Sequence, residues 1–256
     1  MSQDYTFLGV ETRDGVTVAT MNGPSDQNHW QSDTEWELHD LAARTGADES
    51  ARALVLTGAG EYFTSGIGLV VGAFDPFAFY ERARALVNAF FNLDKPVVMA
   101  MNGPATGSGL TLALTGDIII AEEQVTFIDA HVAGGTISAT GSFLWPRNTG
   151  LLNAKRYLLT GEPFDAATAC DIGLVTEVVA RGKALDRALE YGAKFASMPP
   201  TGVQGTKRAL NQWMRRASSE IFDNALAMEF LRLPAMNFDQ LAEKLEHDHH
   251  GGAAKL

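Results

Sequence analysis

Three short apolar runs alternate with longer amphipathic segments in the first half of this chain. They are ALVLT at 53–57, VVMAM at 97–101 and IIIA at 118–121. A nearly continuous apolar run of this length is typical of a strand that is buried on both faces. Helical patterning over 77–93 supplies a crossover between the first two runs, and such crossovers join parallel strands. The pattern therefore predicts an α/β fold with a mostly parallel sheet.

The segments around these runs complete the predicted order of elements. Strands at 7–11 and 16–21 flank the turn Arg13-Asp14-Gly15, which indicates a hairpin, and 33–43 has the period of an amphipathic helix. Further elements are a helix at 110–114, a fourth short strand at 125–128, and helical structure from Asn153 onward, over 166–172, 184–196, 201–217 and 218–228. Because Pro199-Pro200 interrupts this helical region, we expect a core over 1–198 and a helical region over 199–256 that ends in a polar tail.

The charge balance of the chain narrows the classes of partner. The 256 residues include 31 acidic and 20 basic side chains, which give a formal net charge of −11, and no cluster of Lys and Arg opposes it. Binding to nucleic acid is therefore not expected. No apolar stretch reaches the roughly 18–20 residues of a membrane span, and no signal peptide is visible. With Cys170 as the single cysteine, these features predict a cytoplasmic protein whose partner is a small molecule.

Two glycine-rich turns follow predicted strands. One spans 58–69 and includes Gly66 and Gly68; the other spans 102–109, includes Gly107 and Gly109, and precedes a helix. Glycine lets the main chain approach a ligand, and N–H groups at a helix start attract negative charge. Two such turns can each donate one N–H to a single oxygen, which is an oxyanion hole. The alternative interpretation is two ordinary strand-to-helix turns. Neither is a P-loop, because the Lys-Ser/Thr ending is absent.

Several spaced motifs along the chain are similar to those of a known family. They are LTGAG at 56–60, KPVVMAMNG at 95–103, GSG at 107–109, GDIIIA at 116–121, LLTGE at 158–162 and GLVTEVV at 173–179. In this order and spacing they make the chain resemble the crotonase (enoyl-CoA hydratase/isomerase) superfamily over nearly its whole length.

This resemblance implies a fold, a site and an assembly. The fold would be a crotonase-like spiral of ββα units with a helical C-terminal region. The site would lie between the two turns, with the N–H groups of Ile67 and Ser108 as the oxyanion hole. Members of the family bind an acyl-CoA thioester and stabilise its enolate, so coenzyme A would enter as part of the substrate and no separate cofactor is implied. The C-terminal region would pack between subunits of a homotrimer or a dimer of trimers.

Departures from the family pattern bear on the chemistry. The two positions at which hydratases of this family carry glutamates hold Thr111 and His131, and the position that some isomerases use holds Thr140. Gly68 stands where the family has an acid. A threonine hydroxyl is not a general base near neutral pH, whereas a histidine can be one. Hydration by a glutamate pair is therefore not expected of this chain.

His131 is the leading candidate for acid–base catalysis, with Asp129 able to orient it if the backbone allows. The alternative is a hydrogen-bonded, partly buried histidine with no chemical role. The residues expected to contact substrate are Trp30, Gly66, Gly68, Gly107, Gly109, Thr111 and Thr140. No metal site is expected, and Glu35 and Glu37 are interpreted as part of a solvated helix face.

Two other functions remain open. Trp30, Phe127-x-Asp129 and His131 also resemble the 6-oxocamphor hydrolase branch of the superfamily, which cleaves carbon–carbon bonds in cyclic β-diketones without CoA. The match is partial, because the place of that branch's aspartate falls on Thr140 and the place of a second histidine falls on Glu35. The third hypothesis is a catalytically inactive relative that serves as a binding or assembly subunit, which the loss of both glutamates favours.

Overall fold

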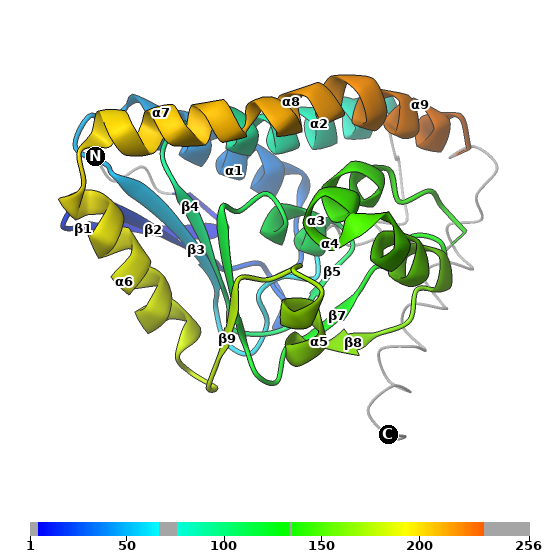
Figure 1. Ribbon diagram of the computed structural model, residues 1–256, viewed down its shortest axis with the longest axis horizontal. Helices are drawn as coiled ribbons and strands as arrows, with labels where there is room; N and C mark the ends of the chain where they lie inside the picture. Colours follow the sequence, from blue (N-terminus) through cyan, green and yellow to red (C-terminus); the bar gives the residue numbers. More distant parts are fainter. Residues whose placement is uncertain (1–4, 67–75, 134, 233–256) are drawn as a thin grey trace.

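A computed structural model describes residues 5–66, 76–133 and 135–232 of the chain. Its strands form two sheets (Figure 1). A six-stranded sheet has the order β1-β2-β3-β4-β6-β9, and a three-stranded sheet has the order β5-β7-β8. The spiral α/β fold expected from the resemblance is present, with helices on both faces of the larger sheet.

The predicted hairpin opens the larger sheet. Strands β1 (Leu8–Arg13) and β2 (Val16–Met21) are antiparallel, and Arg13 lies opposite Val16. Asp14 and Gly15 therefore form a two-residue turn, with φ angles of 48° and 81°. Positive φ at both positions gives the turn the twist that neighbouring strands require.

The centre of the larger sheet consists of the apolar runs. Strands β3 (Ala53–Gly58), β4 (Val97–Met101) and β6 (Ile118–Glu122) lie parallel and side by side. Alternate residues point to opposite faces. One face packs on helix α6 (Ala184–Ser197) and the other on α1 (Ser32–Ala47) and α2 (Pro76–Asn92). This two-sided burial explains why the runs are apolar throughout.

The fourth expected strand exists but belongs to the other sheet. Strand β7 (Thr126–Ile128) pairs with β5 (Ala105–Thr106) and β8 (Phe164–Asp165). The edge of β6 is instead occupied by β9 (Glu177–Val179). The predicted strand at 125–128 is therefore confirmed, and the place beside β6 in the larger sheet goes to β9, which lies about fifty residues further along the chain.

Helical structure after strand β7 starts earlier than the predicted Asn153. Helix α4 spans Ala139–Thr160, with a break at Gly150, where φ is 75° and ψ is 158°. Gly141, Pro146 and Gly150 hide the helical period of its first half. Helix α5 (Ala166–Asp171) follows, capped by Asp165, whose side chain accepts the Thr168 N–H.

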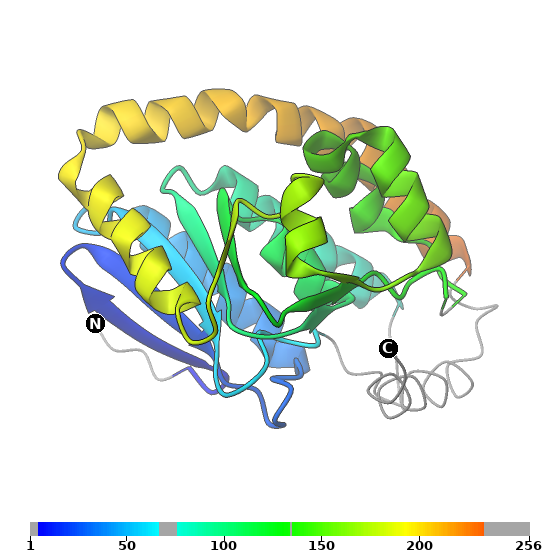
Figure 2. The ribbon, with the colours of Figure 1, turned by 60° about the horizontal axis from the view of Figure 1, so that its bottom comes forward.

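The C-terminal helices follow one another along one edge of the molecule (Figures 1 and 2). They are α7 (Pro200–Leu210), α8 (Gln212–Ala217), a π-helical turn η1 (Ser218–Phe222) and α9 (Asp223–Arg232). Helix α9 contacts α2 and α4, and the ring of Phe222 stacks on Phe143 at 4.9 Å. The predicted polar tail lies outside the described residues.

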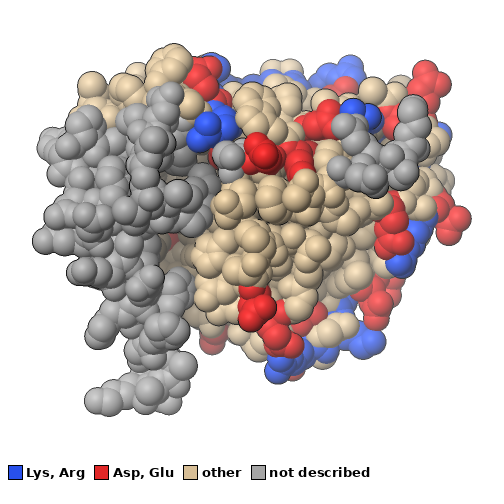
Figure 3. All heavy atoms as spheres, turned by 180° about the vertical axis from the view of Figure 1, so that it is seen from behind, with Lys and Arg blue, Asp and Glu red and all other residues tan. Residues whose placement is uncertain are grey.

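The surface reflects the acidic balance of the chain. On the face shown in Figure 3, basic side chains lie singly or next to acidic ones around a broad uncharged area. Within the described residues, no helix is long and apolar enough to cross a membrane.

Candidate active site

The two glycine turns contact each other, and their glycines make this contact possible. A Cβ atom on Gly66 would lie 2.3 Å from Ser108 Oγ and 2.5 Å from the Gly109 nitrogen. A Cβ atom on Gly109 would lie 2.2 Å from the Thr64 carbonyl oxygen. Side chains at either position would force the turns apart.

Of the two expected oxyanion donors, Ser108 lies at this contact and Ile67 lies outside the described residues. Ser108 is the first residue of helix α3 (Ser108–Ala113), and Gly107, with φ of 52° and ψ of −124°, is its N-cap. Ile67 and Gly68 follow Gly66 directly but lie outside the described residues. The structure therefore describes Ser108, one of the two predicted oxyanion donors. It also places Gly66, the residue before the other predicted donor, in contact with Ser108.

An early loop holds the first turn in place. The backbone N–H of Trp30 donates to the Gly66 carbonyl at 2.8 Å. Thr64 Oγ1 donates to the Asn28 carbonyl at 2.7 Å and accepts a hydrogen bond from the Gly66 N–H. Trp30 is buried, and its indole Nε1 is the one buried side-chain nitrogen or oxygen within the described residues that lacks a hydrogen-bond partner. Trp30 thus lies against the candidate site with an unused donor. The supporting roles of Asn28 and Thr64 are not evident from the sequence.

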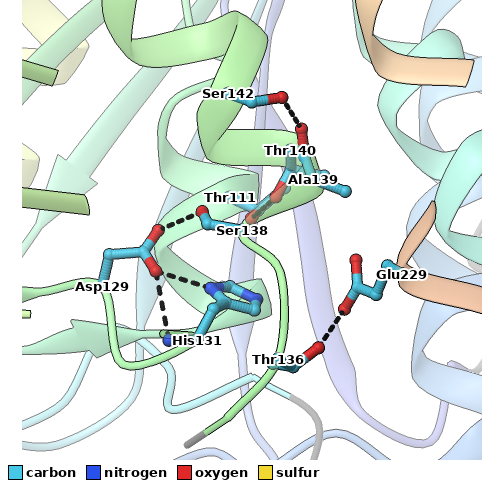
Figure 4. A network of polar contacts seen from close by, with 9 residues as sticks. All are labelled: Thr111, Asp129, His131, Thr136, Ser138, Ala139, Thr140, Ser142 and Glu229. Atoms are coloured by element: carbon cyan, nitrogen blue, oxygen red, sulfur yellow. Dashed lines mark hydrogen bonds and ion pairs between the residues drawn. The ribbon is translucent and has the colours of Figure 1, made fainter. Parts of the chain in front are cut away.

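Asp129 and His131 form a close pair just after strand β7 (Figure 4). His131 Nδ1 lies 2.7 Å from Asp129 Oδ1, which also accepts the His131 backbone N–H. The second carboxylate oxygen accepts a hydrogen bond of 2.9 Å from Ser138 Oγ. The aspartate is therefore fixed on both oxygens, and it fixes the imidazole in turn.

The pair is electrostatically coupled. Burial by itself lowers the pKa of His131, but the charge and the hydrogen bond of Asp129 outweigh it and raise the pKa to about 9. Burial also acts to raise the pKa of Asp129, yet His131 and Ser138 keep that pKa below its usual value. At neutral pH the pair is an imidazolium and a carboxylate.

Two threonines connect this pair to the glycine turns. Thr111 Oγ1, one helical turn after Ser108, lies 2.8 Å from Thr140 Oγ1 at the start of α4. Thr140 is two residues from Ser138, the partner of Asp129. The structure therefore brings together four predicted residues that come from α3, α4 and the segment after β7 (Figure 4).

Glu229 is a member of this cluster that the sequence analysis missed. It lies on α9 and is only 8% exposed, and Thr136 Oγ1 donates to its Oε1 at 3.1 Å. Burial raises its pKa above the usual value, against the opposing effects of His131 and Thr136. A signal existed, because Glu229 continues the buried stripe of Phe222 and Leu226 at helical spacing.

The interpretation of Glu35 as solvated is wrong. Its side chain is 5% exposed and pairs with Arg82 of α2, Nε to Oε2, at 2.8 Å. The ion pair ties α1 to α2, which the local helix pattern could not reveal. Glu37 is half-buried and accepts the backbone N–H groups of Thr6 and Phe7.

Other features of the described residues do not add to the site. A cavity of about 600 Å³ lies between α1 and α2, and its lining includes His39, Arg84 and Asn88 but none of the predicted site residues. Within residues 5–66, 76–133 and 135–232, no group of three or more His, Cys, Asp or Glu side chains could hold a metal ion.

Comparisons with known proteins agree with this architecture. A family model described as enoyl-CoA hydratase/isomerase matches residues 11–234. A probable enoyl-CoA hydratase of Mycobacterium leprae is 33% identical over 245 residues, covering 90% of this chain and 83% of the relative. The 1,2-epoxyphenylacetyl-CoA isomerase of Escherichia coli is 31% identical over 232 residues, covering 87% of each. An enoyl-CoA hydratase/isomerase structure from Mycobacterium paratuberculosis aligns with a TM-score of 0.87 at 31% identity, over 94% of this chain and 98% of that one. The chain belongs to the enoyl-CoA hydratase/isomerase family.

Proposed function

We propose that this protein is an enzyme that moves a proton at a carbon atom activated by the carbonyl of an acyl-CoA thioester. The observation that carries the proposal is the contact of Gly66 with Ser108 and Gly109 beside the Asp129–His131 pair. In this reaction the electron pair of a C–H bond forms a double bond to the carbonyl carbon, and the π pair of the carbonyl moves to its oxygen. Backbone N–H groups of Ile67 and Ser108 then hold the enolate oxygen.

The residues around the turns favour proton transfer over hydration. Thr111 and Thr140 share a hydrogen bond, and a threonine hydroxyl does not activate water near neutral pH. His131 carries a positive charge at that pH because its pKa is about 9. It therefore serves as an acid and as a positive charge near the enolate, rather than as the base.

Relatives support a CoA thioester as the substrate class. Besides the isomerase of E. coli, a protein of Arthrobacter named 4-chlorobenzoyl coenzyme A dehalogenase is 29% identical over 248 residues. Coenzyme A would arrive with the substrate, and the proposal requires no separate cofactor. We extend the proposal to a homotrimer or a dimer of trimers, because large apolar side chains on α4, α7 and α8 are exposed: Leu151, Leu152, Leu159, Leu210 and Trp213.

The test is exchange of carbon-bound hydrogen. Saturated, β,γ-unsaturated and arylacetyl CoA thioesters are incubated with the protein in D₂O, and deuterium uptake next to the carbonyl is followed by mass spectrometry. We expect uptake with at least one class, and a fall of about 10²–10⁴-fold in His131→Ala. His39→Ala is the control, because His39 lies on α1 with its ring against Trp36. Full activity in His131→Ala would remove His131 from the mechanism.

One observation favours a second candidate function. The Asp129–His131 pair, at 2.7 Å, is also suited to CoA-independent hydrolysis of a cyclic β-diketone, in which water adds to one carbonyl and a carbon–carbon bond breaks. Calorimetric titration with CoA and acetyl-CoA separates the two. Saturable binding supports the thioester, whereas absence of binding at millimolar concentration together with turnover of a cyclic β-diketone supports the hydrolase. Inertness towards both substrate classes would leave the non-catalytic hypothesis.

A further inference from the structure

The proposed reaction needs a proton acceptor, and besides Asp129 the described site contains a second buried carboxylate, that of Glu229. Asp129 has both oxygens engaged by His131 and Ser138. Glu229 accepts a hydrogen bond from one side chain, Thr136, on Oε1, and the Ala139 backbone N–H also stabilises its charged form. Figure 4 shows the Glu229 carboxylate on α9 facing the edge of the imidazole that is turned away from Asp129.

The fold holds Glu229 in this position by packing. Phe222, at the end of η1, and Leu226 and Glu229 of α9 are spaced four and three residues apart and are all buried, so they share the inner face of this continuous helical segment. Phe222 stacks on Phe143 of α4 and anchors that face. A glutamate in such a stripe loses solvation that an exposed position would keep. Its presence there needs a compensating role.

We propose that Glu229 is the proton acceptor of this site and that His131, charged on Asp129, is its acid partner across the substrate. The inference rests on the proposed function. The Glu229 carboxylate removes a proton from the carbon next to the carbonyl, the C–H electron pair forms a double bond to the carbonyl carbon, and the π pair of the carbonyl moves to oxygen. When the enolate collapses, Glu229 returns the proton to the same carbon or to the conjugated one. The net result is exchange or a double-bond shift, with no atom gained or lost.

The electrostatic surroundings of Glu229 suit this role. Burial raises its pKa, and the His131 charge, the Thr136 hydroxyl and the Ala139 N–H keep the rise limited. Asp129 acts in the opposite direction.

The other charged and titratable groups near α9 are already engaged. Between α2 and α9, Arg84 and Asp223 pair at 2.8 Å, and Tyr80 packs edge-on against Phe230. On the π-helical turn, Glu220 pairs with Arg216 at the surface. His131 is therefore the cation that responds to the charge of Glu229.

The experiment combines exchange kinetics with a titration that needs no substrate. Deuterium uptake by acyl-CoA is measured from pH 5 to 9 for the protein, Glu229→Gln and Glu229→Asp, with Glu220→Gln as the matched control at an exposed position. We expect the rate of deuterium uptake in Glu229→Gln to fall by about 10²–10⁴-fold and no longer to rise with pH. Glu229→Asp keeps a carboxyl group and retains that rise. In parallel, NMR follows the titration of the His131 ring in each variant, and its midpoint should fall in Glu229→Gln.

The outcomes separate the inference from the proposed function. Exchange that continues unchanged in Glu229→Gln overturns the inference and leaves the proposed function standing. If the unmodified protein promotes no hydrogen exchange in any thioester, the proposed function fails. The NMR titration then tests only whether Glu229 and His131 interact. A His131 midpoint that is the same in Glu229→Gln and in the protein then overturns the pairing.

Discussion

Replacing Asp129 by asparagine tests the electrostatic basis of the site. The rise in the pKa of His131 from 6.5 to about 9 corresponds to about 3 kcal/mol, at about 1.4 kcal/mol for each pKa unit. In Asp129→Asn the carboxylate charge is gone, whereas the imidazole remains 19% exposed. Burial is then the dominant influence and lowers the pKa of His131 below its usual value.

The sign of the effect on stability follows from linkage. Because the pKa of His131 is higher in the folded protein than in the unfolded chain, the contribution of the pair is complete below pH 6.5 and is lost as pH rises through about 9. The difference in unfolding free energy between the protein and Asp129→Asn should therefore be about 3 kcal/mol larger at pH 6 than at pH 10. Urea denaturation at several pH values measures this difference, and NMR of the His131 ring measures the titration itself.

Asp165→Asn is the control for this series. Asp165 caps α5 through the Thr168 N–H, so its replacement should cost the same at pH 6 and pH 10. An Asp129→Asn penalty that is likewise independent of pH would refute the reasoning. So would a His131 ring that titrates at the same pH in the protein and in the variant.

Three further changes probe the fold, the turns and the assembly. Lys207→Met removes a buried ammonium that lies 2.6 Å from Asp117, and should cost about 3–5 kcal/mol in urea denaturation because the remaining carboxylate loses its partner. Gly66→Ala places a Cβ atom 2.3 Å from Ser108 Oγ at a φ of +75°, and should lower exchange by at least about 10²-fold, as loss of an oxyanion donor does. Leu152→Glu charges a side chain that is 84% exposed, and should shift the assembly to smaller species in light scattering.

Each of these changes has a matched control or a contrary outcome. Arg208→Met breaks an exposed pair on the same helix as Lys207 and should cost no more than about 1 kcal/mol. Gly60→Ala has a φ of +66° but open space around its Cβ, so it should leave exchange nearly unchanged. If Arg208→Met cost as much stability as Lys207→Met, or Gly60→Ala slowed exchange as much as Gly66→Ala, the contacts assigned to Lys207 and Gly66 would be contradicted. An assembly that Leu152→Glu leaves unchanged would exclude this part of α4 from the interface.

The elements that sequence predicts well are those whose signal is local. Val97–Met101 is a strand with the predicted bounds, because burial on both faces makes every residue of it apolar. Phe164–Asp165 and Glu177–Val179 are strands only because a distant partner is present. Two or three residues carry no periodicity that could reveal them.

The same division applies to the candidate site. Asp129 and His131 are two residues apart, and the aspartate that accepts the His131 backbone N–H makes a local turn of a common kind. Thr111 and Thr140 meet across 29 positions of sequence. Glu229 reaches the site only because a π-helical turn and the packing of Phe222 set the rotation of α9. Its involvement required the folded structure.

The arrangement around His131 assigns two pH dependences to two groups. From the family resemblance, glutamates are expected at the positions of Thr111 and His131. In this fold the carboxylates near these positions belong to Asp129 and Glu229. Protonating Asp129 would remove the charge that holds the imidazolium and would occupy an oxygen that accepts from His131 or Ser138, whereas Glu229 can gain a proton while the Thr136 hydroxyl remains beside it. Activity should therefore rise as Glu229 loses its proton, at a pH above the usual one for a glutamate because burial raises its pKa, and stability should follow the loss of the His131 charge near pH 9. If both properties changed over the same pH range, one group would be responsible for both, and the division of roles between Glu229 and His131 would be wrong.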